Sequence, residues 1–447
     1  MRIHSSNVDT HALSNCVTYV KVNIGMIRDS LLFCLPVIFA TKTIIISSDG
    51  FRWDYYGRFE TPGLDRIREK GVHVKNLANS FATVTFPNHY TLATGLYEES
   101  HGIVDNEMYD PVFNESFTMQ TVDPKWWNGA EPIWVVSERV GKKAVCVNWV
   151  GCAIEGLRPT YWNEYKGELR YEDRVDRVVE KLSDDAELAL LYFEDPDHTC
   201  HMFGPDSDEL AEAIARVDSA VQYLLTKLDL ETTNIIFTSD HGGYSVSKDR
   251  LIVLQEYSQM QFSLAANGAV AHVWPSDDPA EAVDELVEHF KAIDPRFAKC
   301  YRKEFVPRRL HYSENRRIAP IVCIAELGWS LVHTLEDAEK FRLKGSHGYD
   351  SSLDENSPMR PVFLAAGPDF ITTGLRGTIM EPFENVHIFP LLAELLRIPT
   401  EKLPSINGTL HAVESILKRG QSAGSFVEQL LLASGFTASL AFVLATI

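Results

Sequence analysis

The chain has 447 residues, enough for one large α/β domain or about two to three smaller ones. It carries 62 acidic residues against 42 lysines and arginines, which gives a net charge of −20. Proteins that hold long nucleic acids by charge present a basic face, so this balance argues against such a partner. A small anionic substrate is compatible with it if metal cations supply the local positive charge.

Both ends of the chain have the composition of targeting segments. Residues 26–42, MIRDSLLFCLPVIFATK, combine an arginine, an apolar run and a polar exit, the pattern of a signal peptide, although about 25 residues precede them. A buried first strand is the alternative. Residues 430–447 are uncharged and mostly apolar, and as a helix they would reach about 27 Å, close to a hydrocarbon core. We expect a leader at 1–41 and, at 418–447, a linker with a membrane-anchoring tail, single-pass or glycolipid-linked; an amphipathic terminal helix is the alternative.

Cysteines and glycosylation sequons bear on the compartment. Beyond the expected leader there is no CxxC pair and no dense framework, so disulfides do not build this fold, but one or two are compatible with secretion. The cysteines concerned are Cys146, Cys152, Cys200, Cys300 and Cys323, with Cys300 and Cys323 as a candidate pair. Sequons begin at Asn114 and Asn407. We expect a secreted or cell-surface protein.

Short β-branched apolar runs alternate with helical periodicity through the middle of the chain. Strands are predicted in KTIIISSDG (42–50), KKAVCVNW (142–149), ELALLYFEDPD (187–197), TNIIFTSDHGG (233–243) and RPVFLAAGPD (360–369). Between the third and fourth, residues 206–230 place apolar side chains at steps of four and three, which predicts a helix. Strand, helix, strand indicates an α/β protein with a mostly parallel central sheet and helices on both faces.

The pattern changes over about 245–340, where we expect an inserted, smaller α+β subdomain. GAVAHVWP (268–275) is strand-like and PAEAVDELVEHFKAI (279–293) is helix-like. The basic and aromatic stretch EFVPRRLHYSENRR (304–317) follows.

The stretch FATVTFPNHYTLATGLYEESHG (81–102) places Thr85 where a loop turns into a helix. A helix cap explains this position, because threonine is a favoured N-cap, Pro87 is accepted in a first turn and Gly95 is a plausible stop. The alternative is that the Thr85 hydroxyl also takes part in chemistry.

Residues of the metal-ligand type lie at the ends of the predicted strands. They are Asp49, Asp197 with His201 four residues later, Asp240 with His241, and His347 in KGSHGYD. Because the carboxyl ends of parallel strands meet in one crevice, we expect these six side chains to converge. Their mixture of carboxylate and imidazole fits two Zn²⁺ ions. His198 is an equally available imidazole beside Asp197.

The ordered motifs SSDGFRWDYY, TFPNHYTLATGLYEESHGIVDNEMYDP, EDPDHTCH, TSDHGG and KGSHGYD resemble those of the ectonucleotide pyrophosphatase/phosphodiesterase family, in the alkaline phosphatase superfamily. The likeness covers about residues 42–417 and implies a catalytic domain there, as in the short, membrane-anchored members. It implies one zinc on Asp197, His201 and His347, a second zinc on Asp49, Thr85, Asp240 and His241, and Thr85 as the nucleophile.

The resemblance also implies residues that hold the substrate. Asn106 matches an asparagine that donates to a non-bridging phosphate oxygen. Aromatic side chains would sandwich a nucleotide base: Phe86, Tyr192 and, as a looser candidate, Tyr161. Val84 and Glu107 stand where relatives carry lysine, and both changes remove positive charge that could hold a second phosphate.

We therefore expect an extracellular metal-dependent phosphodiesterase or nucleotide pyrophosphatase. It would act through a phospho-threonine intermediate and release a nucleoside 5′-monophosphate. One alternative is a choline-type lysophospholipase or glycerophosphodiesterase, which the missing lysines keep open and which needs an acidic or aromatic cage for a quaternary ammonium. The other is a catalytically silent ectodomain, against which the full set of ligands and the hydroxyl argue.

Overall fold

The computed structural model describes residues 18–21, 32–35, 41–276, 279–374 and 376–418. Residues 1–41 and 42–447 form two separate units. In the first, strands β1 (Thr18–Lys21) and β2 (Leu32–Leu35) pair in antiparallel fashion. The rest of the predicted leader and the apolar tail lie outside the described residues. Within those residues, no helix is both long enough and apolar enough to cross a membrane.

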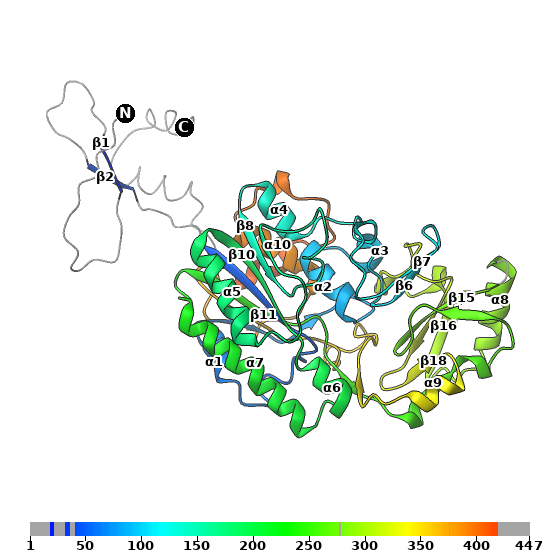
Figure 1. Cartoon of the computed structure of the whole chain (residues 1–447). Coiled ribbons are helices and arrows are strands. Elements are labelled where there is room, and N and C mark those ends of the chain that lie inside the picture. Colours follow the sequence, from blue (N-terminus) through cyan, green and yellow to red (C-terminus); the bar gives the residue numbers. More distant parts are fainter. Residues whose placement is uncertain (1–17, 22–31, 36–40, 277–278, 375, 419–447) are drawn as a thin grey trace. The chain divides into compact units, whose positions relative to one another are not determined.

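A seven-stranded sheet forms the centre of the second unit (Figure 1). Its order is β4 (Gly71–Val74), β20 (Phe363–Ala366), β11 (Thr233–Thr238), β3 (Lys42–Ser48), β10 (Ala186–Phe193), β8 (Lys143–Val147) and β9 (Tyr161–Trp162). The five strands from β11 to β9 pair in parallel, whereas β20 pairs antiparallel with both of its neighbours. The predicted fold class, with a mostly parallel sheet, is confirmed.

Helices cover both faces of this sheet (Figure 1). One face carries α1 (Pro62–Lys70), α5 (Tyr171–Asp184) and α7 (Asp208–Lys227), and the other carries α2 (Thr85–Thr94), α4 (Ile133–Arg139) and α10 (Ile388–Leu395). In β3, Ile44 and Ile46 pack toward the first layer and Ile45 toward the second, and all three are fully buried. A strand covered on both sides reads as a continuous apolar run.

The predicted helix at 206–230 is α7, which begins after Ser207, whose side chain accepts a hydrogen bond from the backbone N–H of Leu210. This helix lies in the connection from β10 to β11, and these two strands flank β3 on either side. The carboxyl ends of β10, β3 and β11 are therefore neighbours along one edge of the sheet.

The segment expected to be an insertion contains a smaller, antiparallel sheet in the order β14 (Phe262–Leu264), β15 (Val270–Pro275), β17 (Ile321–Ala325) and β16 (Ala298–Arg302). Helix α8 (Pro279–Phe290) packs on it through Val283, Leu286 and Phe290. Strands β13 (Leu251–Val253) and β18 (Ser330–Val332) and helix α9 (Leu335–Lys340) complete this region. The precise domain boundaries stay a prediction.

The remaining short elements connect these layers. They are β5 (Leu77–Ala78) with β21 (Phe383–Glu384), β6 (Met108–Asp110) with β7 (Glu115–Phe117), β12 (Tyr244–Ser245) with β19 (Gly345–Ser346), α3 (Glu98–His101) and α6 (Asp197–Phe203). The structure pairs Cys300 with Cys323, as expected, and also pairs Cys146 with Cys152, which was not expected; Cys200 is free and buried.

Candidate active site

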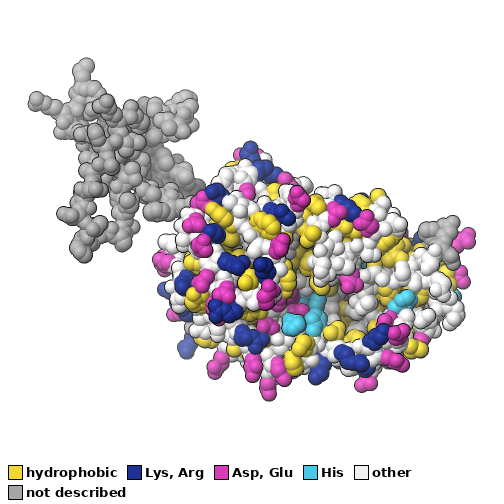
Figure 2. Space-filling model, viewed as in Figure 1, with side chains coloured by type: hydrophobic (Ala, Val, Ile, Leu, Met, Phe, Trp, Pro, Cys, Tyr) yellow, Lys and Arg dark blue, Asp and Glu magenta, His cyan; other side chains and the backbone are white. Residues whose placement is uncertain are grey.

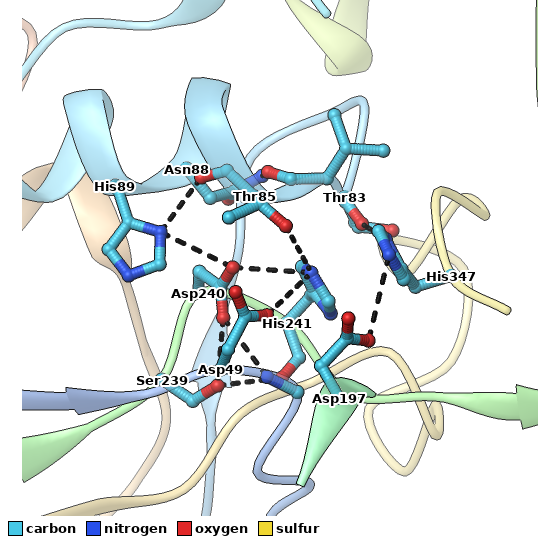
Figure 3. A network of polar contacts seen from close by, with 12 residues as sticks. Asp49, Thr83, Thr85, Asn88, His89, Asp197, Ser239, Asp240, His241 and His347 are labelled. Atoms are coloured by element: carbon cyan, nitrogen blue, oxygen red, sulfur yellow. Dashed lines mark hydrogen bonds and ion pairs between the residues drawn. The ribbon is translucent and has the colours of Figure 1, made fainter. Parts of the chain in front are cut away.

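The six predicted metal-ligand residues converge at the carboxyl edge of the sheet. Asp49 directly follows β3, Asp240 and His241 follow β11, and Asp197 opens α6 just after β10. His347 comes from the loop after β19, and Figure 3 shows its ring close to Asp197 and His241. Figure 2 shows histidine side chains, with acidic side chains beside them, in a hollow of the surface near α2 and α6.

Thr85 is the first residue of α2, but it does not cap the helix. The N-cap is Val84, and no side chain accepts a capping hydrogen bond there; Gly95 ends the helix in the left-handed region at φ 67°, as predicted. The Thr85 Oγ1 atom instead lies 3.3 Å from Nε2 of His241, and the residue is 8% exposed. The cap interpretation is therefore wrong, and the hydroxyl points at the ligand cluster (Figure 3).

Asp49 and Asp240 each hold one carboxylate oxygen in a fixed position and leave the other unpaired. Asp49 Oδ2 accepts a hydrogen bond from the Tyr192 hydroxyl at 2.5 Å, and Asp240 Oδ1 accepts from the Ser239 hydroxyl at 3.0 Å. Asp49 Oδ1 and Asp240 Oδ2 are buried and have no hydrogen-bond partner among the described residues; they lie 3.3 and 3.2 Å from Nε2 of His241. Buried oxygens without partners are costly, and a bound cation would satisfy both of them.

Asp197 gathers two histidines on its two oxygens. Nε2 of His201 lies 3.1 Å from Oδ2, and Nε2 of His347 lies 3.7 Å from Oδ1. The rings of His241 and His347 stack with centroids 3.6 Å apart. Ligand atoms of Asp49, Asp240 and His241, and those of Asp197, His241 and His347, therefore form two compact groups that could hold metal ions. The predicted ligand His201 contacts Asp197 but lies outside both groups, and His241 belongs to both.

The three histidines share one hydrogen-bond arrangement on their other ring nitrogen. Nδ1 donates to the backbone carbonyl of Gly242 from His241 at 2.8 Å, to that of Gly345 from His201 at 2.9 Å, and to that of Thr83 from His347 at 3.0 Å. Because a carbonyl can only accept, Nδ1 carries a proton in each ring, which leaves Nε2 as the atom that could coordinate a metal ion. A carbonyl behind each histidine is the usual support of a metal-binding imidazole. The donor set and its supports fit metal ions.

The pKa shifts of the Asp and His side chains in the cluster also indicate that positive charge would stabilise it. Burial, together with the carboxylates of Asp240 and Asp197, raises the pKa of Asp49 well above its ordinary value. Asp197 in turn raises the pKa of His201 to about 9, whereas burial and the neighbouring His241 lower the pKa of His347 to about 3. Cations between these groups would stabilise the ionised carboxylates and the neutral imidazoles together.

Asn106 and Phe86 lie beside Thr85, as the resemblance implied. The Asn106 Oδ1 atom accepts a hydrogen bond from the backbone N–H of Phe86 at 2.8 Å. The Nδ2 protons of the amide therefore do not take part in this contact. The Phe86 ring is half-buried and packs against Phe117 and Trp127, each with centroids 6.1 Å apart. Phe86 directly follows Thr85 in the chain, and its backbone N–H ties Asn106 to the start of α2.

Tyr192 and Tyr161 do not take the positions expected of base-binding residues. Tyr192 is 7% exposed inside β10, and its hydroxyl supports Asp49 instead of facing solvent. Tyr161 in β9 donates to Asp185, which precedes β10 and so lies at the amino edge of the sheet, opposite the cluster. His198 is exposed and belongs to neither ligand group.

Two neighbours of the cluster were missed by the sequence reasoning. His89 donates from Nδ1 to the backbone carbonyl of Thr85 at 2.8 Å and lies 3.3 Å from Asp240 Oδ2; its position four residues after Thr85 on one helix was a usable signal. Tyr165 is 60% exposed, and partial burial with the carboxylates of Glu194 and Asp49 raises its pKa. Tyr165 lies in a loop, and no spacing or motif in the sequence marks it as a residue of the site.

A mostly parallel α/β sheet with two Asp/His groups and a buried hydroxyl at its carboxyl edge is the arrangement of a hydrolase of the alkaline-phosphatase-like class. A family model described as type I phosphodiesterase / nucleotide pyrophosphatase matches residues 43–350. The chain belongs to this ectonucleotide pyrophosphatase/phosphodiesterase family and is a hydrolase.

Relatives and solved structures agree with this membership. Ectonucleotide pyrophosphatase/phosphodiesterase family member 5 of Homo sapiens is 38% identical over 388 residues, 84% of this chain and 78% of that protein. Bis(5′-adenosyl)-triphosphatase of Xenopus laevis is 35% identical over 387 residues, 84% of this chain and 81% of that protein. The structure of murine member 5 matches with a TM-score of 0.78 at 36% identity, covering 84% of this chain and 100% of that one. An inactive Thr-to-Ala variant of murine member 5, in complex with AMP, matches with a TM-score of 0.77 at 36% identity over 85% of this chain and 100% of that one.

Proposed function

We propose that this chain is an extracellular phosphodiesterase that hydrolyses phosphodiester or pyrophosphate bonds of nucleotides and releases a nucleoside 5′-monophosphate. The observation that carries the proposal is the Thr85 hydroxyl, which lies 3.3 Å from Nε2 of His241, a member of both Asp/His groups, and does not cap its helix. Relatives named as nucleotide pyrophosphatases and as a bis(5′-adenosyl)-triphosphatase support the substrate class. A related inactive Thr-to-Ala variant that holds AMP supports both an essential threonine and a nucleotide ligand.

Two Zn²⁺ ions are the proposed cofactors. One would be held by Asp49, Thr85, Asp240 and His241, and the other by Asp197, His201 and His347. When bound, such ions supply positive charge and make a coordinated hydroxyl a better nucleophile. Three carboxylates against two divalent ions leave one net positive charge, which suits a phosphodiester anion.

The chain's own residues then carry the reaction in two steps. Thr85 Oγ1 attacks phosphorus, and the phospho-threonine bond forms as the bond to the leaving alcohol or phosphate breaks. Water later cleaves the Thr85–phosphate bond and releases the monophosphate. The N-terminus of the ten-residue helix α2 adds positive potential beside the phosphate. Asn106, held by Phe86 N–H through Oδ1, would donate from Nδ2 to a non-bridging oxygen.

The half-buried Phe86 ring is the proposed surface for a base, because it adjoins the nucleophile and is backed by other aromatic rings. The exposed Tyr165 ring, whose pKa the carboxylates of Glu194 and Asp49 help to raise, is a second aromatic candidate. Val84 and the exposed Glu107 provide no cation beside the site. We infer that a second phosphate is held weakly.

A choline phosphodiester is the second candidate substrate class. The exposed Tyr165 ring, whose pKa the Glu194 carboxylate helps to raise, is the feature that favours it, although Arg174 already pairs with this carboxylate at 2.8 Å. An aromatic face and a carboxylate together suit a quaternary ammonium group.

An extracellular location is part of the proposal. The human relative, family member 5, carries the prefix ecto in its name. The structure pairs four cysteines as two disulfides, and both sequon asparagines, Asn114 and Asn407, are exposed. Attachment through the apolar segment 430–447 stays a prediction, because that segment lies outside the described residues.

A side-by-side assay tests the substrate class. Purified, zinc-loaded protein is given bis(5′-adenosyl) triphosphate and glycerophosphocholine at equal concentrations, with Thr85→Ala as the control for contaminating activity. The proposal expects AMP from the first substrate and a kcat/KM at least tenfold higher than for the second, a difference of about 1.4 kcal/mol. The opposite preference would identify the choline-type enzyme, and no turnover of either would refute a hydrolase of these esters.

A further inference from the structure

Asn106 sits in the loop between α3 and β6, residues 102–107, and nothing within that loop would by itself hold it next to Thr85. Its side chain makes the contact with Phe86 N–H already described, and its backbone N–H donates to Asp105 Oδ1 at 2.7 Å. The aim of Asn106 therefore depends on what fixes the two ends of the loop, at Gly102 and at Asp110 in β6.

A single guanidinium group bridges those two ends. Arg317 donates from Nη1 to the backbone carbonyl of Gly102 at 2.6 Å and from Nε to Asp110 Oδ2 at 2.9 Å. Nη1 also donates to the carbonyl of Trp126 at 2.8 Å. Arg317 is 4% exposed and Asp110 is fully buried, so this contact is not a surface ion pair. A β-carbon on Gly102 would come within 3.2 Å of Nη1 and would sit at φ 81°.

Two neighbouring residues of the same segment, Arg316 and Tyr312, also hold the loop. Arg316 binds both oxygens of Asp110, at 3.0 Å from Nε and 2.8 Å from Nη2. The Tyr312 hydroxyl donates to the backbone carbonyl of Val104, two residues before Asn106, at 2.6 Å. His272 Nε2, on β15 of the small sheet, lies 2.9 Å from the same hydroxyl. Tyr312 and His272 are both buried.

All of these contacts come from residues 312–317, the end of the basic and aromatic stretch that lies outside the Asp/His groups. The segment is anchored to the small antiparallel sheet through His272, and it reaches the catalytic loop through buried donors. Two guanidinium groups on the buried carboxylate of Asp110 hold its pKa well below the ordinary value, so the ion pair persists over the working pH range.

We propose that Arg317, with Tyr312, is a positioning residue for Asn106, and that the inserted subdomain thereby sets the geometry of phosphate binding beside Thr85. The inference rests on the proposed function, because it assigns Asn106 to the phosphate. Its physical basis is that a side chain aimed from a loop is accurate only when the loop ends are rigid, and displacements near 1 Å cost catalysis heavily.

The test is a double-mutant cycle between Arg317→Lys and Asn106→Ala, read as kcat and KM for bis(p-nitrophenyl) phosphate. Lysine keeps the charge but cannot donate to Gly102, Trp126 and Asp110 together. When Asn106 is present, we expect Arg317→Lys to lower kcat/KM about tenfold, mainly through kcat. In the Asn106→Ala background, the same substitution should leave kcat/KM unchanged. Tyr312→Phe, which removes only the hydroxyl on Val104, should give a smaller loss, about threefold, with the same dependence on Asn106.

Arg302→Lys is the matched control. Arg302 belongs to the same small sheet and forms an exposed ion pair with Asp284. It should leave both kcat and KM unchanged. Thermal unfolding of every variant shows how much protein is folded in the assay. If Asn106 is misplaced, Arg317→Lys protein that is fully folded must still show the lower kcat.

The outcomes distinguish this inference from the proposed function. If the wild type turns over and Asn106→Ala is impaired, but Arg317→Lys and Tyr312→Phe match the wild type or act additively with Asn106→Ala, the positioning role is wrong while the proposed function stands. If the wild type shows no turnover, the proposed function fails, and the same cycle read as AMP affinity decides the inference. Additive losses, or no AMP binding, would then overturn it.

Discussion

Thr85→Ala separates the two explanations of Thr85 because the structure assigns the hydroxyl no capping role. The substitution removes one buried methyl group and a hydroxyl whose contact is the 3.3 Å approach to His241. Each loss is worth about 1 kcal/mol, so the free energy of unfolding should fall by roughly 1–2 kcal/mol. In a domain of this size the Tm should drop by only a few degrees, about 2–4 °C per kcal/mol at most.

Catalysis should respond on a different scale. Removing a nucleophile typically costs about 10⁴-fold or more in kcat. The matched control is Thr94→Ala, at the other end of the same helix, where the hydroxyl donates to the backbone carbonyl of Tyr90 and is fully buried. It loses the same atoms from α2 and should show a similar fall in Tm with full activity.

The assay is release of p-nitrophenol from bis(p-nitrophenyl) phosphate, with zinc content measured on the same samples. Turnover by Thr85→Ala within tenfold of the wild type would refute Thr85 as the nucleophile. Equal losses in Thr85→Ala and Thr94→Ala would mean that the helix, and not the hydroxyl, was disturbed.

Three further predictions test the surroundings of the site. Asp240→Asn removes one of the two unpaired buried oxygens, so metal analysis should find about one zinc fewer and activity should be lost with it; two retained equivalents would contradict the ligand assignment. Tyr192→Phe removes the donor to Asp49 Oδ2 and should weaken zinc affinity about 10-fold in a chelator competition, whereas an unchanged affinity would deny Tyr192 this supporting role. Burial raises the pKa of Glu98, which accepts from the Ser80 hydroxyl at 2.6 Å, to about 8 from 4.5. The folded protein therefore keeps a proton that the unfolded chain has lost, and this stabilisation, complete below pH 4.5, disappears as the pH rises through about 8. Glu98→Gln, which cannot ionise, should show a smaller fall in Tm between about pH 5 and about pH 9, and parallel curves would contradict the shift.

The sequence was sufficient where burial and strand direction leave little choice. The run Ile44–Ile46 is apolar on both sides because helices cover both faces of the sheet, so its strand was readable without any partner. The convergence of Asp49, Asp240 and Asp197 followed from the carboxyl ends of three parallel strands, which need only the topology.

Contacts that depend on strand register and on side-chain direction could not be predicted from the sequence. Tyr161 begins β9 after a loop, and its pairing opposite Val145 sends the hydroxyl to Asp185 at the far edge. Tyr192 and Asp49 belong to neighbouring strands, and only their register brings the hydroxyl onto the carboxylate. The bond between Cys146 and Cys152 likewise depends on a loop path that spacing does not specify.

The position of β3 in the middle of the sheet has a consequence for heat inactivation. Asp49 is attached to a strand that is hydrogen-bonded on both sides, to β10 and β11, and sealed by helices above and below. Amides in such a strand exchange with solvent only when the whole domain opens. Asp49 should therefore keep its place until the domain melts, so any earlier loss of activity on heating would begin in the loops that carry His347 and Asn106.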